Sequence, residues 1–126
     1  KTKEAVITTA PTPPALKNEI VKFLEDHKAL DILTVDLEGR TTIADYLVIA
    51  SGTSQRQLSA TAELLREHLK SIGVTPVYIE GVPQCDWVLI DAGDVIVHLF
   101  RPEIREFYNI EKMWDLDTPV AEISSL

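Results

Sequence analysis

The sequence is poor in cysteine: Cys85 is the only one among 126 residues. A single thiol cannot form an internal disulfide, and no secretory signal is visible, so we expect a cytoplasmic protein in a reducing compartment. Because the sequence begins with Lys1 rather than Met, an upstream segment such as an organelle-targeting peptide stays open as an alternative. Cys85 also lies in no recognisable thiol motif, so it gives no support to thiol catalysis.

Long apolar runs and clusters of basic residues are missing as well. No apolar stretch approaches the ~18 residues that a membrane-spanning helix requires, so we expect no contact with a membrane. The chain has 12 Lys and Arg against 20 Asp and Glu, which gives a net charge of −8. Because binding to nucleic acid phosphates depends on clustered Lys and Arg, we expect no direct, sequence-specific binding of nucleic acid; a basic protein partner fits the charge better.

Established fingerprints of cofactor and metal sites are also absent. The chain has neither the Gly-x-Gly-x-x-Gly pattern of dinucleotide sites nor the Gly-Lys-Ser/Thr of a phosphate-binding loop. Its histidines, His27, His68 and His98, show no ligand spacing with one another or with Cys85. We therefore expect no cofactor and no metal. His98 lies in an apolar run, where the commonest role of a histidine is that of a neutral core group with one hydrogen-bond partner.

The patterns that are present predict a single compact domain. A hydrophobic fraction of 45% and a charged fraction of 25% over this length are ordinary for a soluble globular domain. The spacing of apolar residues and turn formers predicts a helix from Pro13 to about 27, followed by strands near 32–35 and 46–50. A second helix is predicted over 55–72, ended by Gly73. Then come a strand at 76–81, a hairpin of two strands at 86–100 and a helix from Pro102, with a helical tendency that continues over 110–114.

This order of elements predicts an α/β (α+β) fold in which a mixed five-stranded sheet is flanked by helices. The strand at 46–50 has no polar alternation, which indicates that both of its faces are covered. We expect residues 1–14 to form a flexible arm, 15–117 the domain and 118–126 a tail.

The turn Gly52-Thr53-Ser54 connects a strand directly to a helix, and it has two interpretations. Free N–H groups at a helix N-terminus can hold a phosphate. Alternatively, Thr53 or Ser54 accepts those N–H groups as a cap worth ~1 kcal/mol, while Gly52 permits a sharp exit from the strand. The missing fingerprints favour the cap.

A nucleotidyltransferase is the enzyme alternative, because such enzymes have a similar turn. They also need two carboxylates, two residues apart on the next strand, to hold magnesium. The only Asp-x-Asp in the chain is Asp115-Leu116-Asp117, after the last helix. Asp91 and Asp94 instead flank a predicted hairpin tip, where aspartate favours turns. If the chain were such an enzyme, Asp91 and Asp94 would have to bind the magnesium ion beside a nucleotide held by Gly52 and Ser54, and nucleotide binding would depend on magnesium.

Large aromatic residues and carboxylates gather in the last third of the chain. For any one of them core packing is the ordinary explanation, but together they match a docking surface for a basic protein. We expect the contacts to include Trp87, Asp91, Asp94, Tyr108 and Trp114. A homodimer formed through the same aromatic surface is a further alternative.

Several separated segments resemble, in order and spacing, the Iojap family, whose bacterial members are called ribosomal silencing factors. These segments are DYLVIASGTSQRQLSATAELL from Asp45, WVLIDAGDVIVHLF from Trp87, REFY from Arg105 and IEKMW from Ile110. The resemblance covers about residues 15–119. It implies a domain shaped like nucleotidyltransferases but lacking their catalytic carboxylates, and therefore no enzyme. It also implies docking on the large ribosomal subunit through its ribosomal protein number fourteen, which blocks association with the small subunit and represses translation.

Overall fold

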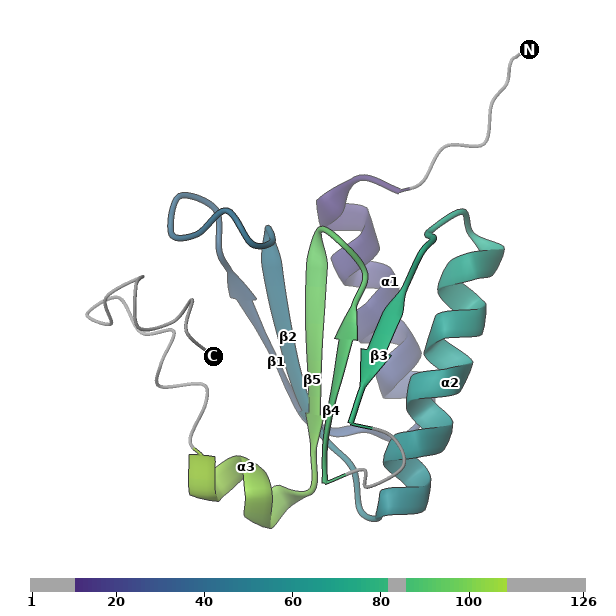
Figure 1. Ribbon diagram of the computed structural model, residues 1–126, viewed down its shortest axis with the longest axis vertical. Coiled ribbons are helices and arrows are strands. Elements are labelled where there is room, and N and C mark those ends of the chain that lie inside the picture. Colours follow the sequence, from purple (N-terminus) through teal and green to yellow (C-terminus); the bar gives the residue numbers. More distant parts are fainter. Residues whose placement is uncertain (1–10, 82–85, 109–126) are drawn as a thin grey trace.

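The computed structural model describes residues 11–81 and 86–108. In these residues the chain forms three helices and five strands, in the predicted order (Figure 1): α1 (Pro13–Asp26), β1 (Leu30–Asp36), β2 (Tyr46–Ser51), α2 (Gln55–Ser71), β3 (Tyr78–Glu80), β4 (Trp87–Asp91), β5 (Val95–Phe100) and α3 (Pro102–Tyr108). Pro13 and Pro14, placed in the predicted arm, form the first turn of α1. The rest of that arm, the helical tendency at 110–114 and the predicted tail lie outside the described residues.

The strands form one sheet with the order β1-β2-β5-β4-β3. The pairs β1/β2, β3/β4 and β4/β5 are antiparallel, whereas β2 and β5 at the centre are parallel. The prediction of a mixed five-stranded sheet is therefore confirmed. The parallel pair is possible because the chain leaves β2 through α2 and returns through β3 and β4 before it reaches β5.

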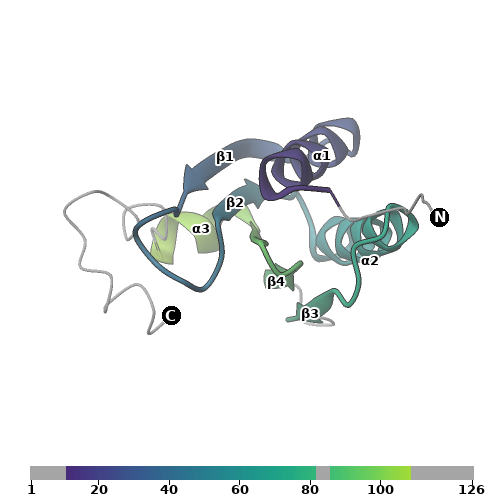
Figure 2. The ribbon, with the colours of Figure 1, turned by 90° about the horizontal axis from the view of Figure 1, so that it is seen from above.

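One face of the sheet is covered by α1 and α2, and α3 lies on the other side (Figure 2). The inner strand β2 is buried throughout Leu47–Ala50. Its side chains alternate: Val48 and Ala50 join the core beneath α1 and α2, while Leu47 and Ile49 join a second cluster with Phe100. The prediction that this strand is covered on both faces is confirmed.

The helices pack through the stripes that their apolar spacing predicts. In α1 the buried residues are Leu16, Ile20 and Leu24, and in α2 they are Leu58, Thr61, Ala62, Leu65 and Leu69. Thr61 is the one member of the α2 stripe that hydrophobic spacing does not reveal, since it is polar. No helix in the described residues is both long enough and apolar enough to span a bilayer.

The second face of the sheet is covered unevenly. Within the described residues α3 is the only helix on this side, and it packs at one end of β5. Toward the β3 edge the side chains are half-buried or exposed. We call this area the open face; by strand alternation it comprises Tyr78 and Glu80 on β3, Trp87, Leu89 and Asp91 on β4, and Ile96 on β5.

Candidate functional site

The Gly52-Thr53-Ser54 turn is a helix cap in the structure. Ser54 is the N-cap of α2, and its Oγ accepts the backbone N–H of Gln57 at 3.0 Å. The Gln57 side-chain oxygen in turn accepts the backbone N–H and, at 2.9 Å, the hydroxyl of Thr53. Two of the N–H groups at this helix N-terminus, those of Thr53 and Gln57, are thus used within the turn, and the predicted cap is confirmed. The signal that sequence reasoning missed is the Ser-x-x-Gln spacing, which is typical of a capping box.

Gly52 is required for a different reason from the one expected. Its φ is not in the left-handed region, so the sharp exit from β2 does not depend on glycine. A Cβ at this position would instead lie 2.5 Å from Cδ2 of Leu58. Because Leu58 is a core residue of α2, glycine here allows the helix to pack closely against the end of the strand.

Removing the cap should have a measurable cost. We expect Ser54→Ala to lower the free energy of unfolding by ~1 kcal/mol, because the N–H of Gln57 loses its acceptor. The comparison variant is Ser59→Ala in the interior of α2, where alanine is the better helix former and stability should not fall. Urea unfolding monitored by circular dichroism measures both. Equal losses for the two variants would contradict the capping role.

The structure does not bring together the residues that the nucleotidyltransferase alternative requires. Gly52 donates its N–H to the carbonyl of Phe100 at one end of β5, while the carbonyl of Asp94 accepts the N–H of Asp45 at the other end. The six residues of β5 separate these points by about 20 Å. The turn and the two aspartates therefore lie at opposite ends of the sheet (Figure 1). Among the described residues no group of three or more His, Cys, Asp and Glu is arranged to hold a metal ion.

Asp91 and Asp94 shape the turn between β4 and β5. Oδ1 of Asp91 accepts the N–H of Gly93 at 2.9 Å, as expected of an aspartate beside a turn. The carbonyl of Asp94 accepts two N–H groups, from Asp45 at 2.8 Å and Tyr46 at 3.2 Å, and so ties the turn to the start of β2. Asp94 itself is exposed. Its backbone is structural, whereas its carboxylate is available to a partner.

Trp87 and His98 form a pair on neighbouring strands. The indole Nε1–H of Trp87 donates to Nδ1 of His98 at 2.8 Å, and the Trp87 ring lies 4.8 Å from that of Phe100. His98 is only 7% exposed, and burial lowers its pKa from 6.5 to about 4. An indole N–H only donates, so Nδ1 is the acceptor of a neutral ring. The predicted role of His98 as a neutral core group with a hydrogen-bond partner is confirmed.

The pairing of β3 with β4 adds two residues to the open face that sequence reasoning missed. Tyr78 lies opposite Asp91, and Glu80 lies opposite Leu89. Tyr78 is 62% exposed, which is unusual for a large aromatic side chain. No signal in the sequence identifies it, because its position beside Asp91 depends on the register between the two strands.

The five residues that the sequence predicts as partner contacts lie in different parts of the structure. Trp87 and Asp91 lie on the same face of β4, and Asp94 lies in the turn that follows. Tyr108 is the last residue of α3, at the end of β5 away from that turn, and nothing is described of its side chain. Trp114 lies outside the described residues. The structure thus places Asp91 near Asp94, whereas Trp87 lies on the same face at the other end of β4, where it pairs with Phe100. It adds Tyr78 and Glu80 to this face.

These features define a class of protein: a small α+β domain in which helices cover one face of the sheet, while the other face, as far as residues 11–81 and 86–108 show it, is partly uncovered and carries aromatic and acidic side chains. The family follows from comparison with known proteins. The family model described as "Ribosomal silencing factor during starvation" matches residues 10–126. The chain belongs to the ribosomal silencing factor family, as the resemblance in its sequence implies.

Individual relatives agree with this assignment. The chain is 48% identical over 114 residues to the ribosomal silencing factor of Zymomonas mobilis, covering 87% of this chain and 86% of the relative. It is 39% identical over 99 residues to that of Bacillus subtilis, covering 79% and 83%. A crystal structure of a Chromobacterium violaceum protein superimposes with a TM-score of 0.79 at 33% identity, covering 90% of this chain and 98% of that one. Both named relatives carry the name of a regulatory factor.

Proposed function

We propose that this protein docks on the large ribosomal subunit through its ribosomal protein number fourteen, prevents the small subunit from joining and thereby represses translation in the cytoplasm. The docking unit is the domain of residues 15–117. Membership of the silencing factor family supports this proposal. The observation that carries it is the open face together with the turn at one end of it: Leu89 and Ile96 are half-buried on the face, and the exposed Asp94 lies in the turn between β4 and β5. Trp87, also half-buried, lies at the other end of the same face.

The proposed mechanism is steric and involves no enzymatic step. A domain bound to the face that the small subunit must reach excludes that subunit by its volume, so neither a cofactor nor a metal is needed. The contacts are proposed to include Trp87, Asp91, Asp94, Tyr108 and Trp114. Exposed ion pairs contribute only ~0–1 kcal/mol each, so the aromatic side chains supply most of the affinity and the carboxylates accelerate the encounter.

The central test is co-sedimentation of the protein with isolated large subunits. We expect the unmodified protein to co-migrate at low salt and to reduce the fraction of joined ribosomes when small subunits are added. Asp94→Lys should weaken binding by about tenfold, because it reverses a charge that faces a basic partner. Asp94 is the cleanest acidic position to change, since its structural hydrogen bonds come from its backbone.

The matched control is Glu25→Lys, which makes the same change in net charge at an exposed position of α1. It should bind like the unmodified protein. Absence of co-migration at low salt, or equal weakening by the two substitutions, would reject docking through the open face. Combining Tyr108→Ala with Trp114→Ala tests the aromatic contribution. A homodimer that covers the same face would compete with docking, and sedimentation velocity would detect it.

A further inference from the structure

Among the described residues, β3 forms one edge of the sheet and is paired on one side only. It pairs with β4 alone, and in the described part of the chain no strand follows it in the sheet. Alternate residues of an antiparallel edge strand direct their N–H and C=O groups away from the sheet. Such groups can form backbone hydrogen bonds with an extended segment of another chain, which then adds a strand.

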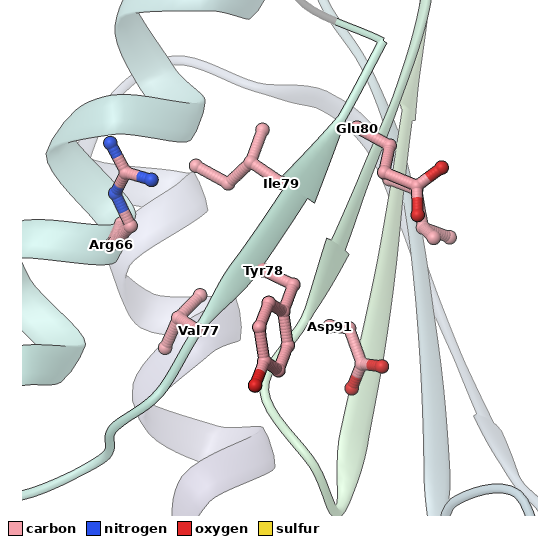
Figure 3. A pocket seen from close by; sticks show the side chains of 7 residues that line it. Arg66, Val77, Tyr78, Ile79, Glu80 and Asp91 are labelled. Carbon is pink, nitrogen blue, oxygen red and sulfur yellow. The ribbon is translucent and has the colours of Figure 1, made fainter.

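A groove surrounds this edge. It has a volume of about 470 Å³ and is lined by Val77 to Glu80, by Arg66 of α2, and by Leu89 and Asp91 of β4. Figure 3 shows that Val77 and Ile79 extend toward α2, whereas Tyr78, Glu80 and Asp91 lie on the other side of β3. We call this region the β3 groove. Alternating side chains of β3 and of Val77 before it form both walls, and Leu89 and Asp91 of β4 and Arg66 of α2 complete the lining.

The two walls differ in chemistry. Val77 and Ile79 pack partly against the core beneath α2, so the wall on that side is apolar. The opposite wall presents the exposed phenol ring of Tyr78 and the carboxylates of Glu80 and Asp91. Of the described residues that line the groove, Arg66 is the single cation; it lies on the α2 side and is paired with Glu63. The wall formed by Tyr78, Glu80 and Asp91 is therefore acidic and aromatic.

We propose that the β3 groove binds a basic, extended segment of a partner protein by strand addition. In an added strand, successive side chains point to opposite faces, so the segment alternates basic and apolar residues. Its basic residues meet Glu80, Asp91 and the ring of Tyr78, which attracts cations through its π face. Its apolar residues meet Val77 and Ile79. The groove shares Asp91 with the proposed ribosomal contacts, but the inference rests on the free edge of β3 and is tested without ribosomes.

The short length of β3 sets a limit on this interaction. With three residues, the strand offers only a few backbone hydrogen bonds, so the side-chain walls must contribute much of the affinity. A short edge that carries a charge is also a common protection against aggregation. Protection alone predicts that no peptide binds at this edge, and this difference can be tested.

The probe is a fluorescein-labelled synthetic peptide of alternating lysine and valine, titrated with the full chain at low salt and followed by fluorescence anisotropy. We expect saturable binding. The same peptide with N-methyl groups on alternate residues keeps its charge but cannot pair along a strand, and it should bind about tenfold more weakly. A peptide of alternating glutamate and valine should not bind. Equal affinity for the methylated and unmethylated peptides would overturn strand addition.

Substitutions locate the binding on the protein. Glu80→Lys should weaken binding of the lysine and valine peptide by about fivefold, because it reverses a charge on the acidic wall. Glu25→Lys, with the same change in net charge on α1, should leave binding unchanged. In ¹⁵N-labelled protein, the amide signals of Tyr78–Glu80 should shift on titration. Equal effects of the two substitutions, or shifts confined to another element, would reject the β3 groove.

A second copy of the chain is the competing occupant of this edge. Sedimentation velocity over a range of protein concentrations tests it without any peptide. A dimer that Glu80→Lys alters and Glu25→Lys leaves intact would replace the peptide proposal with self-pairing at β3. A monomer that binds the peptide supports the proposal. Because neither measurement uses ribosomes, failure of ribosome docking and failure of peptide binding are distinguishable.

Discussion

Replacing Gly81 with alanine should lower the free energy of unfolding by about 3 kcal/mol, combining left-handed backbone strain with a steric clash. Gly81 has a φ of +102°, a conformation that residues with a side chain disfavour. A Cβ there would also lie 2.2 Å from the carbonyl oxygen of Trp87. Because that oxygen belongs to the backbone at the start of β4, the clash is relieved only if the strand moves.

Two other glycines separate these causes. Gly39 has a φ of +80°, but no atom lies within 4 Å of the position that a Cβ would take, so Gly39→Ala measures backbone strain alone and should cost about 1 kcal/mol. Gly52 has no left-handed φ but lies close to Leu58, so Gly52→Ala measures crowding against a side chain. Urea unfolding of the three variants should place Gly81→Ala last in stability. Similar losses of stability for Gly39→Ala and Gly81→Ala would show that a small shift of the Trp87 carbonyl relieves the clash at little cost.

The second large effect is a loss of stability in acid that originates at His98. Burial lowers the pKa of this histidine from 6.5 to about 4, so between these values the unfolded chain binds a proton that the folded chain does not. Stability is therefore complete above pH 6.5 and falls as the pH decreases toward 4. A difference of about 2.5 pKa units corresponds to roughly 3 kcal/mol.

His98→Asn isolates this contribution. Asparagine does not titrate, and its side-chain oxygen is an acceptor of the kind that the indole N–H of Trp87 now uses. Unfolding free energies of both proteins should be measured from pH 7.5 to 4. Carboxylates contribute to both curves, so the difference between the curves reports the histidine, and it should shrink as the pH falls. A constant difference across this range would contradict a neutral, buried His98.

Local patterns in the sequence predict most of the fold. Apolar spacing identifies the buried stripes of α1 and α2, and the uninterrupted run at Leu47–Ala50 identifies the strand that is covered on both faces. Turn residues predict the Asp91 turn and the end of α2. These features succeed because each depends on residues within a few positions of one another.

Features that depend on pairing between distant strands are not accessible in this way. The parallel contact of β2 with β5 decides that the Gly52 turn and Asp94 lie at opposite ends of the sheet, so the residues that the nucleotidyltransferase alternative requires do not form one site. The register of β3 on β4 brings Tyr78 beside Asp91, and that of β4 on β5 brings Trp87 within reach of His98. The sequence identifies Trp87 as a contact candidate, but its hydrogen bond to the core appears only in the structure.

The two hydrogen bonds to the Asp94 carbonyl also affect the entropy cost of docking a partner at this turn. The turn that carries Asp94 is hydrogen-bonded to Tyr46, the first residue of β2, and to Asp45 before it. Ordering a loose loop on binding consumes part of the interaction free energy as lost conformational entropy. A turn held by a strand that is buried over Leu47–Ser51 has already lost that freedom during folding. The Asp94 backbone is therefore preorganised, and docking there need order little more than side chains.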